Sequence, residues 1–115
     1  MNSVYLEHIN EWFDPYDLFS GTGRKKIRTA IKDRFPSISA EEQKEFEDYL
    51  EQFEAYCINY AQILADKYKT PFLPSDEDSR MEIDKYVAEC QKIYPEFNRK
   101  VIRGLFSTVC WLSNR

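Results

Sequence analysis

Large side chains recur every seven residues between Ser39 and Lys69, at offsets typical of one face of a helix. They are Phe46, Tyr49, Leu50, Phe53, Tyr56, Cys57, Tyr60, Ile63 and Leu64. Three apolar positions per heptad form one stripe along a helix, and no strand has this period. Ser39 and Glu42 have capping-box spacing, and Thr70-Pro71 ends the pattern because proline cannot continue a helix. The spacing therefore predicts a long central helix over about residues 40–69.

Shorter patterns on both sides predict further helices. Residues 3–13 and 24–35 each carry apolar residues on one side, and residues 75–79 resemble a helix cap before a pattern that ends at Tyr94. Its predicted buried side includes Ile83, Val87, Cys90 and Ile93. Pro95-Glu96 is predicted to start a last helix, because proline is acceptable in a first turn. That helix has an unusually wide apolar sector, which indicates either a position among several helices or cover by a partner.

These elements predict one all-α domain covering residues 1–115. It is a helical bundle of four principal helices plus a short N-terminal helix, and Phe72 and Leu73 of the apolar connector 71–74 are expected to lie over the core. The central helix would be ~45 Å long, whereas a compact sphere of this length is ~35 Å across. We therefore expect an elongated bundle, with a bent or a projecting helix as the alternatives.

Composition narrows the class of protein. The net charge of −4 disfavours contact with nucleic acid or anionic membrane except through a local basic patch. The first twenty residues do not resemble a signal peptide, and residues 105–112 are too short an apolar stretch to span a bilayer. Cys57, Cys90 and Cys110 are widely spaced and lie on or beside apolar helix faces, which favours buried free thiols over a disulfide or a metal site. We expect a cytoplasmic protein.

Residues that could form a catalytic or metal site are scarce. His8 is the single histidine, so neither a catalytic triad nor a di-metal bundle with two Glu-x-x-His pairs can be assembled. The acidic run at 76–78 lacks the glycine and the closing glutamate of a calcium loop, because Met81 and Val87 occupy those positions. The sequence predicts a non-enzymatic protein without a cofactor.

A basic helix follows two glycines. Six of the twelve residues from Arg24 to Phe35 are basic, opposed by Asp33 alone. Free amides and cations at a helix N-terminus favour an anion such as phosphate. The candidate anion-binding residues are Gly23, Arg24, Lys25, Arg28 and Lys32. A solvated basic face that balances acidic neighbours is the other interpretation.

The central helix carries the opposite charge. Between Ser39 and Tyr56 there are seven acidic residues and one lysine. Glu47, Asp48 and Glu51 are expected on the side away from the apolar stripe, with Glu54 at its flank. These four residues, which we call the acidic ridge, are either a solvated face or a docking surface for a basic partner.

The combination of small size, negative charge and helical structure resembles toxin immunity proteins, in those three general properties alone. We therefore predict a protein-binding module of the inhibitor, immunity or antitoxin type, with a basic toxin or nuclease as its partner. The alternative function is a regulator that binds nucleic acid or a phosphorylated ligand through residues 24–34. The tyrosines and Trp12 and Trp111 are interpreted as core residues or as an interface, and a homodimer through the C-terminal helix is a further possibility.

Overall fold

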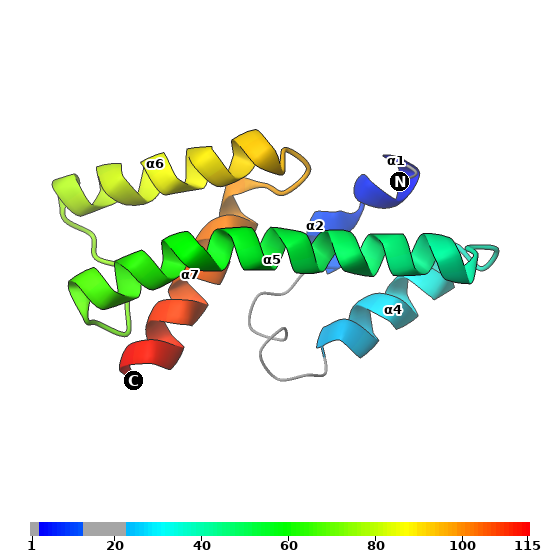
Figure 1. Cartoon of the computed structure of the whole chain (residues 1–115), viewed down its shortest axis with the longest axis horizontal. Coiled ribbons are helices and arrows are strands. Elements are labelled where there is room, and N and C mark those ends of the chain that lie inside the picture. The colour runs from blue at the N-terminus through cyan, green and yellow to red at the C-terminus, as the bar shows by residue number, and fades with distance from the viewer. Residues whose placement is uncertain (1–2, 13–22) are drawn as a thin grey trace.

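The computed structural model describes residues 3–12 and 23–115 and shows an all-α protein with four principal helices (Figure 1). The helices are α1 (Ser3–Leu6), α2 (Ile9–Trp12), α4 (Gly23–Arg34), α5 (Ala40–Tyr68), α6 (Glu77–Ile93) and α7 (Arg99–Asn114). The side chains of Ser3, Trp12 and Arg24 lie outside the described part. The predicted turn at 15–19 and the glycine loop before Gly23 also fall outside it.

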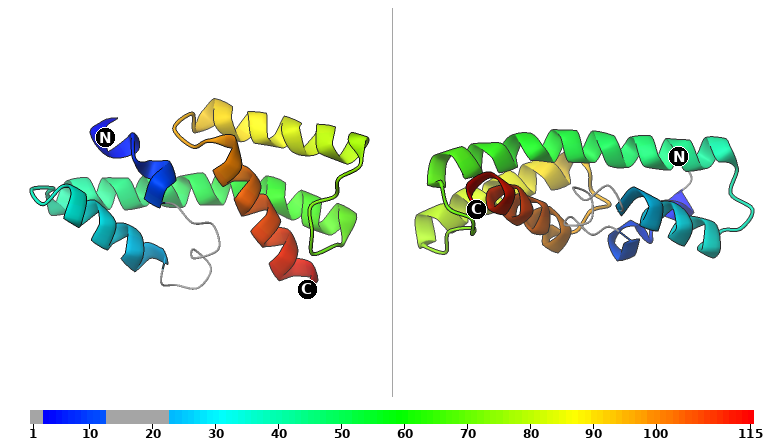
Figure 2. Two further views of the ribbon diagram at one scale, coloured as in Figure 1. Left: turned by 180° about the vertical axis from the view of Figure 1, so that it is seen from behind. Right: turned by 90° about the horizontal axis from the view of Figure 1, so that it is seen from below.

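Helix α5 forms one side of the molecule by itself. The view from below in Figure 2 shows the other helices on one side of α5, with α2 and α4 against its N-terminal half and α6 and α7 against its C-terminal half. The overall dimensions are 47 × 27 × 18 Å. The expected elongated bundle is therefore correct, and none of the other described helices covers the far side of α5.

Both ends of α5 are fixed by local chemistry. The Ser39 side chain accepts a hydrogen bond from the Glu42 amide at 3.1 Å, and the Glu42 side chain accepts one from the Ser39 amide at 3.2 Å, which confirms the capping box. Lys69 ends the helix in the left-handed conformation with φ 50°, and its amide donates to the Ala65 carbonyl. The helix thus ends before Pro71 can interrupt it.

The apolar stripe of α5 holds for two heptads and then shifts. Phe46, Leu50, Phe53 and Cys57 are buried as predicted, but Ile63 is 48% exposed and Ala61 and Ala65 take core positions with Leu64. A straight helix has 3.6 residues per turn, so a strict seven-residue pattern drifts by about 20° per heptad. By the third heptad the drift has moved Ile63 out of the core.

Helix α6 starts at Glu77, with Asp76 as its cap, and its buried residues include Ile83, Val87 and Cys90. Ile93 was predicted to be buried, but it is 51% exposed. The prediction for the connector is half right, because Leu73 packs against the core whereas Phe72 is 70% exposed. The short connector has room to bury one of its two large side chains.

Helix α7 begins later than predicted. Pro95-Glu96 is not its first turn, because the Asn98 side chain caps the helix by accepting a hydrogen bond from the Val101 amide at 2.8 Å. An Asn cap leaves residues 94–97 in a turn, closed by the Phe97 amide and the Tyr94 carbonyl. The wide apolar sector of α7 is buried because α7 packs against both α5 and α6.

The predicted single N-terminal helix is in fact two short ones. Amide-to-carbonyl bonds from His8 to Tyr5 and from Glu11 to His8 connect α1 and α2 through a turn. Ile9 is fully buried, and Ile27 and Ile31 bring α4 into the same cluster.

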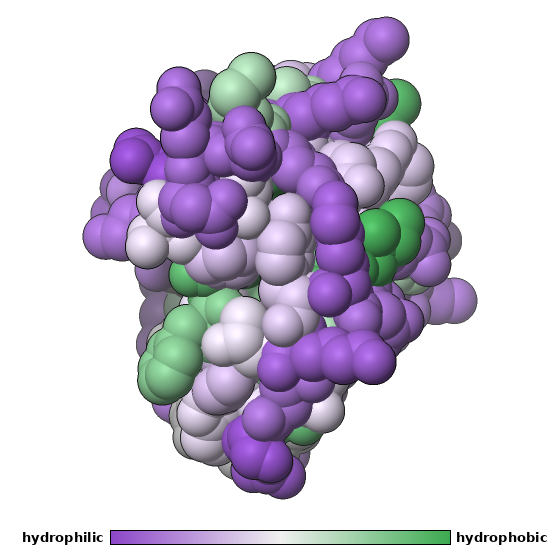
Figure 3. Space-filling view, turned by 90° about the vertical axis from the view of Figure 1, so that its left-hand side faces the viewer, coloured by the Kyte–Doolittle hydropathy of each residue, from purple (hydrophilic) through white to green (hydrophobic). Residues whose placement is uncertain are grey.

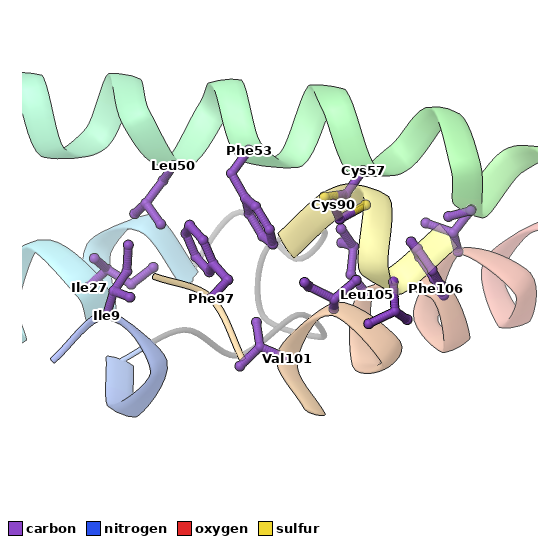
Figure 4. Close-up of a cluster of buried hydrophobic side chains, with 14 of the residues drawn as sticks. Ile9, Ile27, Leu50, Phe53, Cys57, Cys90, Phe97, Val101, Leu105 and Phe106 are labelled. Atoms are coloured by element: carbon purple, nitrogen blue, oxygen red, sulfur yellow. The ribbon is translucent and has the colours of Figure 1, made fainter. Parts of the chain in front are cut away.

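The core runs along the covered side of α5. Figure 4 shows Phe53 and Phe97 facing each other at its centre. Their ring centroids are 3.5 Å apart with 5° between the planes, and the Tyr94 ring meets Phe53 edge-on at 5.6 Å. The connector before α7 is thereby anchored against the middle of α5.

Candidate protein-binding surface and basic helix

The four residues of the acidic ridge do not share one environment. Asp48 and Glu51 are exposed on α5, as predicted, whereas Glu47 and Glu54 are partly buried. Glu47 was expected to point away from the stripe, but it lies at the edge where α4 approaches α5. The acidic surface open to a partner is therefore centred on Asp48 and Glu51, with Glu41 and Glu45 exposed on the preceding turns.

The basic helix and the acidic ridge meet directly. Arg28 Nε donates a hydrogen bond to Glu47 Oε1 at 2.7 Å, and the side chains are 60% and 21% exposed. The Glu47 carboxylate raises the pKa of Arg28, first through this hydrogen bond and then through its charge. Their positions in the sequence assign these two residues to rival binding surfaces, but the fold pairs them with each other.

Of the other candidate anion-binding residues, Lys32 alone is described in the same hollow as Arg28. Gly23 begins α4, the Arg24 side chain is outside the described part, and Lys25 is exposed. Lys32 Nζ lies 3.5 Å from the Ile38 carbonyl, to which it donates. Arg28, Thr29, Lys32, Asp33 and Gln43 line a shallow hollow between α4 and α5, where Asp33 partly neutralises the cations.

The N-terminal histidine takes part in a local contact. His8 Nδ1 lies 3.2 Å from Glu11 Oε2, one turn further along the chain. Among residues 3–12 and 23–115, no three His, Cys, Asp or Glu side chains are arranged to hold a metal ion.

Tyrosines form a continuous row between α5 and α6. The ring centroids are 5.7 Å apart for Tyr56 and Tyr60, 5.0 Å for Tyr60 and Tyr86, and 5.7 Å for Tyr56 and Tyr94. A hydrogen bond with Tyr60 and partial burial raise the pKa of Tyr56 to about 12. Tyr49 donates to Glu96 beside the turn before α7. The rings thus fill core space while their hydroxyls bond at its rim, which is the packing interpretation of these residues.

The exposed apolar side chains do not form one broad patch. They are Val4, Ile63, Phe72, Met81, Ile93 and Trp111, and they come from four helices and the connector. Figure 3 views the end of the molecule where α5 ends and α6 begins, and its green areas are small and separated by purple ones. Arg115 covers the Trp111 ring, with its guanidinium carbon 5.1 Å from the ring centroid. Singly exposed apolar residues are ordinary on protein surfaces.

The part of the chain that the structure describes holds no helix long and apolar enough to cross a membrane. Comparisons with family models, with curated proteins and with solved structures find no match to this chain.

Proposed function

We propose that this chain is a protein-binding module that docks on a basic partner through the uncovered side of α5. The observation that carries the proposal is the exposure of Asp48 and Glu51 on the helix side that no other described helix covers. With Glu41 and Glu45 they form an exposed acidic surface on the N-terminal half of α5, interrupted by Lys44. Such a surface attracts a positively charged partner over a distance and speeds its association.

The helix dipole does not account for the acids at Asp48 and Glu51. The helix dipole favours carboxylates within the first turn, which contains Glu41 and Glu42, but the effect has faded by Asp48 and Glu51. Exposed positions of the C-terminal half include the neutral residues Ala55, Asn59 and Gln62, besides the oppositely charged Asp66 and Lys67. The charge is thus concentrated beyond what capping or solvation of the helix needs.

Two candidate cations of the basic helix are engaged within the protein. Arg28 is engaged with Glu47, and Lys32 donates to a backbone carbonyl. Both contacts hold cations against the protein. Binding of nucleic acid or of a phosphorylated ligand through α4 is therefore the second candidate function. Variants of α4 and α5 distinguish it from binding of a basic protein.

The class of partner follows from the charge. A toxin or nuclease with a basic active surface is complementary to a rigid acidic helix, because carboxylates can occupy the positions that phosphates would take. Blocking such a surface makes the module an inhibitor of the immunity or antitoxin type.

The test is affinity capture from the native cells with nuclease treatment, followed by binding measurements on each captured protein. The first variant replaces Glu45, Asp48 and Glu51 by Lys, and the matched control replaces Lys25 and Lys32 by Glu. Glu47 is left unchanged because it pairs with Arg28. We expect the wild type and the control to retain a basic protein. The affinity of that protein for the acidic-surface variant should be at least tenfold lower.

Salt dependence distinguishes the two candidates. In the proposed function, raising the salt concentration weakens binding by the wild type, and the acidic-surface variant loses this dependence. Retention of nucleic acid that the Lys25 and Lys32 variant abolishes would support the alternative instead. Equal binding by all three proteins would show that neither charged surface takes part.

A further inference from the structure

Two cysteines from different helices meet inside the core. Cys57 lies in the middle of α5 and Cys90 near the end of α6, and neither has exposed surface. Figure 4 shows their side chains directed toward each other with the sulfur atoms adjacent. Both thiols are free in this structure, as predicted. A hydrogen bond with Cys90, together with burial, raises the pKa of Cys57.

The third cysteine differs in this respect. Cys110 of α7 is also buried and free, but burial alone raises its pKa, with no thiol among the causes. The three cysteines therefore divide into a facing pair and a single residue. Because all three share the same burial, Cys110 is a matched internal control for the chemistry of the pair.

We propose that Cys57 and Cys90 form a reversible disulfide that ties α5 to α6 under oxidising conditions. Rotation of the two side chains has to bring sulfur atoms already in hydrogen-bond contact to a bond length of about 2.05 Å. The bond would close a loop that contains the end of α5, the connector and most of α6. Closing such a loop restricts the unfolded chain and so favours the folded one, and the same bond fixes the row of tyrosines at the contact between the two helices.

The oxidant is a low-molecular-weight disulfide, for which oxidised glutathione is the probe. One protein thiolate attacks it, a mixed disulfide forms, and the first reduced glutathione leaves. The second protein thiolate then attacks the cysteine sulfur of the mixed disulfide, the protein disulfide forms, and the second reduced glutathione leaves. The two protein thiols lose two electrons, glutathione disulfide gains them, and the two thiol protons end on the two glutathione molecules.

Burial sets the rate of this exchange. A thiol without exposed surface and with a raised pKa is a poor nucleophile, so the first attack requires α6 to open locally from α5. The same burial then shields the finished bond from reductants. The disulfide between Cys57 and Cys90 should therefore form slowly, and its reduction should also be slow until α6 opens again.

The experiment incubates the full chain in glutathione buffers of increasing oxidised fraction, stops exchange with a thiol-blocking reagent in denaturant so that every remaining thiol is accessible, and maps peptides without reduction. We expect the loss of two hydrogen atoms in mass, one linked peptide pair containing Cys57 and Cys90, and Cys110 in the blocked form. The oxidised protein should unfold at a Tm roughly 5–15 °C higher, and reduction should reverse the rise.

Variants assign the effect to the pair. Cys110→Ala should keep both the linked peptide and the rise in Tm, whereas Cys57→Ala and Cys90→Ala should lack both. The proposal would be overturned if all three thiols were found blocked at the highest ratio of oxidised to reduced glutathione. A disulfide that includes Cys110, or an oxidised protein with an unchanged Tm, would also overturn it. Because mass and Tm are read on the wild type, the result does not depend on whether a variant folds, and it leaves the proposed binding function unaffected.

Discussion

Replacing Phe53 by alanine tests the centre of the fold. Phe53 has no exposed surface, and its ring lies between Phe97 and Tyr94 under the middle of α5. Truncating a buried phenylalanine costs about 3–5 kcal/mol, since the lost burial is joined by a cavity that its neighbours fill incompletely. The parallel stack on Phe97 is not the arrangement that ring quadrupoles prefer, so no further term is added for it. We expect a loss of about 4 kcal/mol in the free energy of unfolding.

The assay is urea and thermal unfolding followed by far-UV circular dichroism. For a domain of this length the entropy of unfolding is roughly 240 cal/mol/K, so a loss of about 4 kcal/mol lowers Tm by about 15 °C. Phe72→Ala is the matched control, because it removes the same side chain from a position that is 70% exposed. It should change stability by no more than about 0.5 kcal/mol. A loss below about 1 kcal/mol at Phe53, or equal losses at both positions, would refute the proposed core.

Three further predictions follow from caps, carboxylates and thiols. Ser39→Ala should lower stability by about 1 kcal/mol in urea unfolding, whereas Ser37→Ala in the preceding turn should not; equal effects would contradict the capping box. Hydrogen bonds from Tyr5 to Glu42 and from Ser79 to Asp76 hold both carboxyl pKa values below their usual range. Their contribution is present above the unfolded pKa and is lost as pH falls through the folded one, so the urea midpoint should drop between about pH 5 and pH 2, and a flat midpoint would contradict this. The cysteine thiols should react with a disulfide reagent slowly in the native protein and rapidly after denaturant is added, and fast native labelling would show that they are accessible.

The central helix was predictable because its signals are local. The cap at Ser39 depends on residues three apart, and the first two heptads of the stripe depend on helical geometry alone. The third heptad failed at Ile63 because a repeat of seven residues drifts around a straight helix. Small residues such as Ala61 and Ala65 then became core positions, and a search for large side chains passes over them.

The ends of the other helices were harder to predict, because neighbouring residues favour different boundaries. Pro95 is acceptable in a first turn, but Asn98 offers a side-chain acceptor for the free Val101 amide, and the cap decides where α7 begins. Ile93 has the spacing of a buried residue, yet no helix among the described residues covers it. Periodicity gives the direction of a side chain, whereas burial also requires a neighbour.

The same distinction governs the charged surfaces. Glu47 and Asp48 are both predicted on the acidic ridge, because both lie off the apolar stripe. The fold separates them, since α4 covers the flank that carries Glu47 and leaves Asp48 exposed. A Glu47→Lys variant would place a second cation against Arg28, so a loss of binding in that variant would report a disturbed contact between α4 and α5. Asp48 is exposed on the side away from α4 and can be reversed without this ambiguity, so it is the position at which binding by α5 is tested most directly.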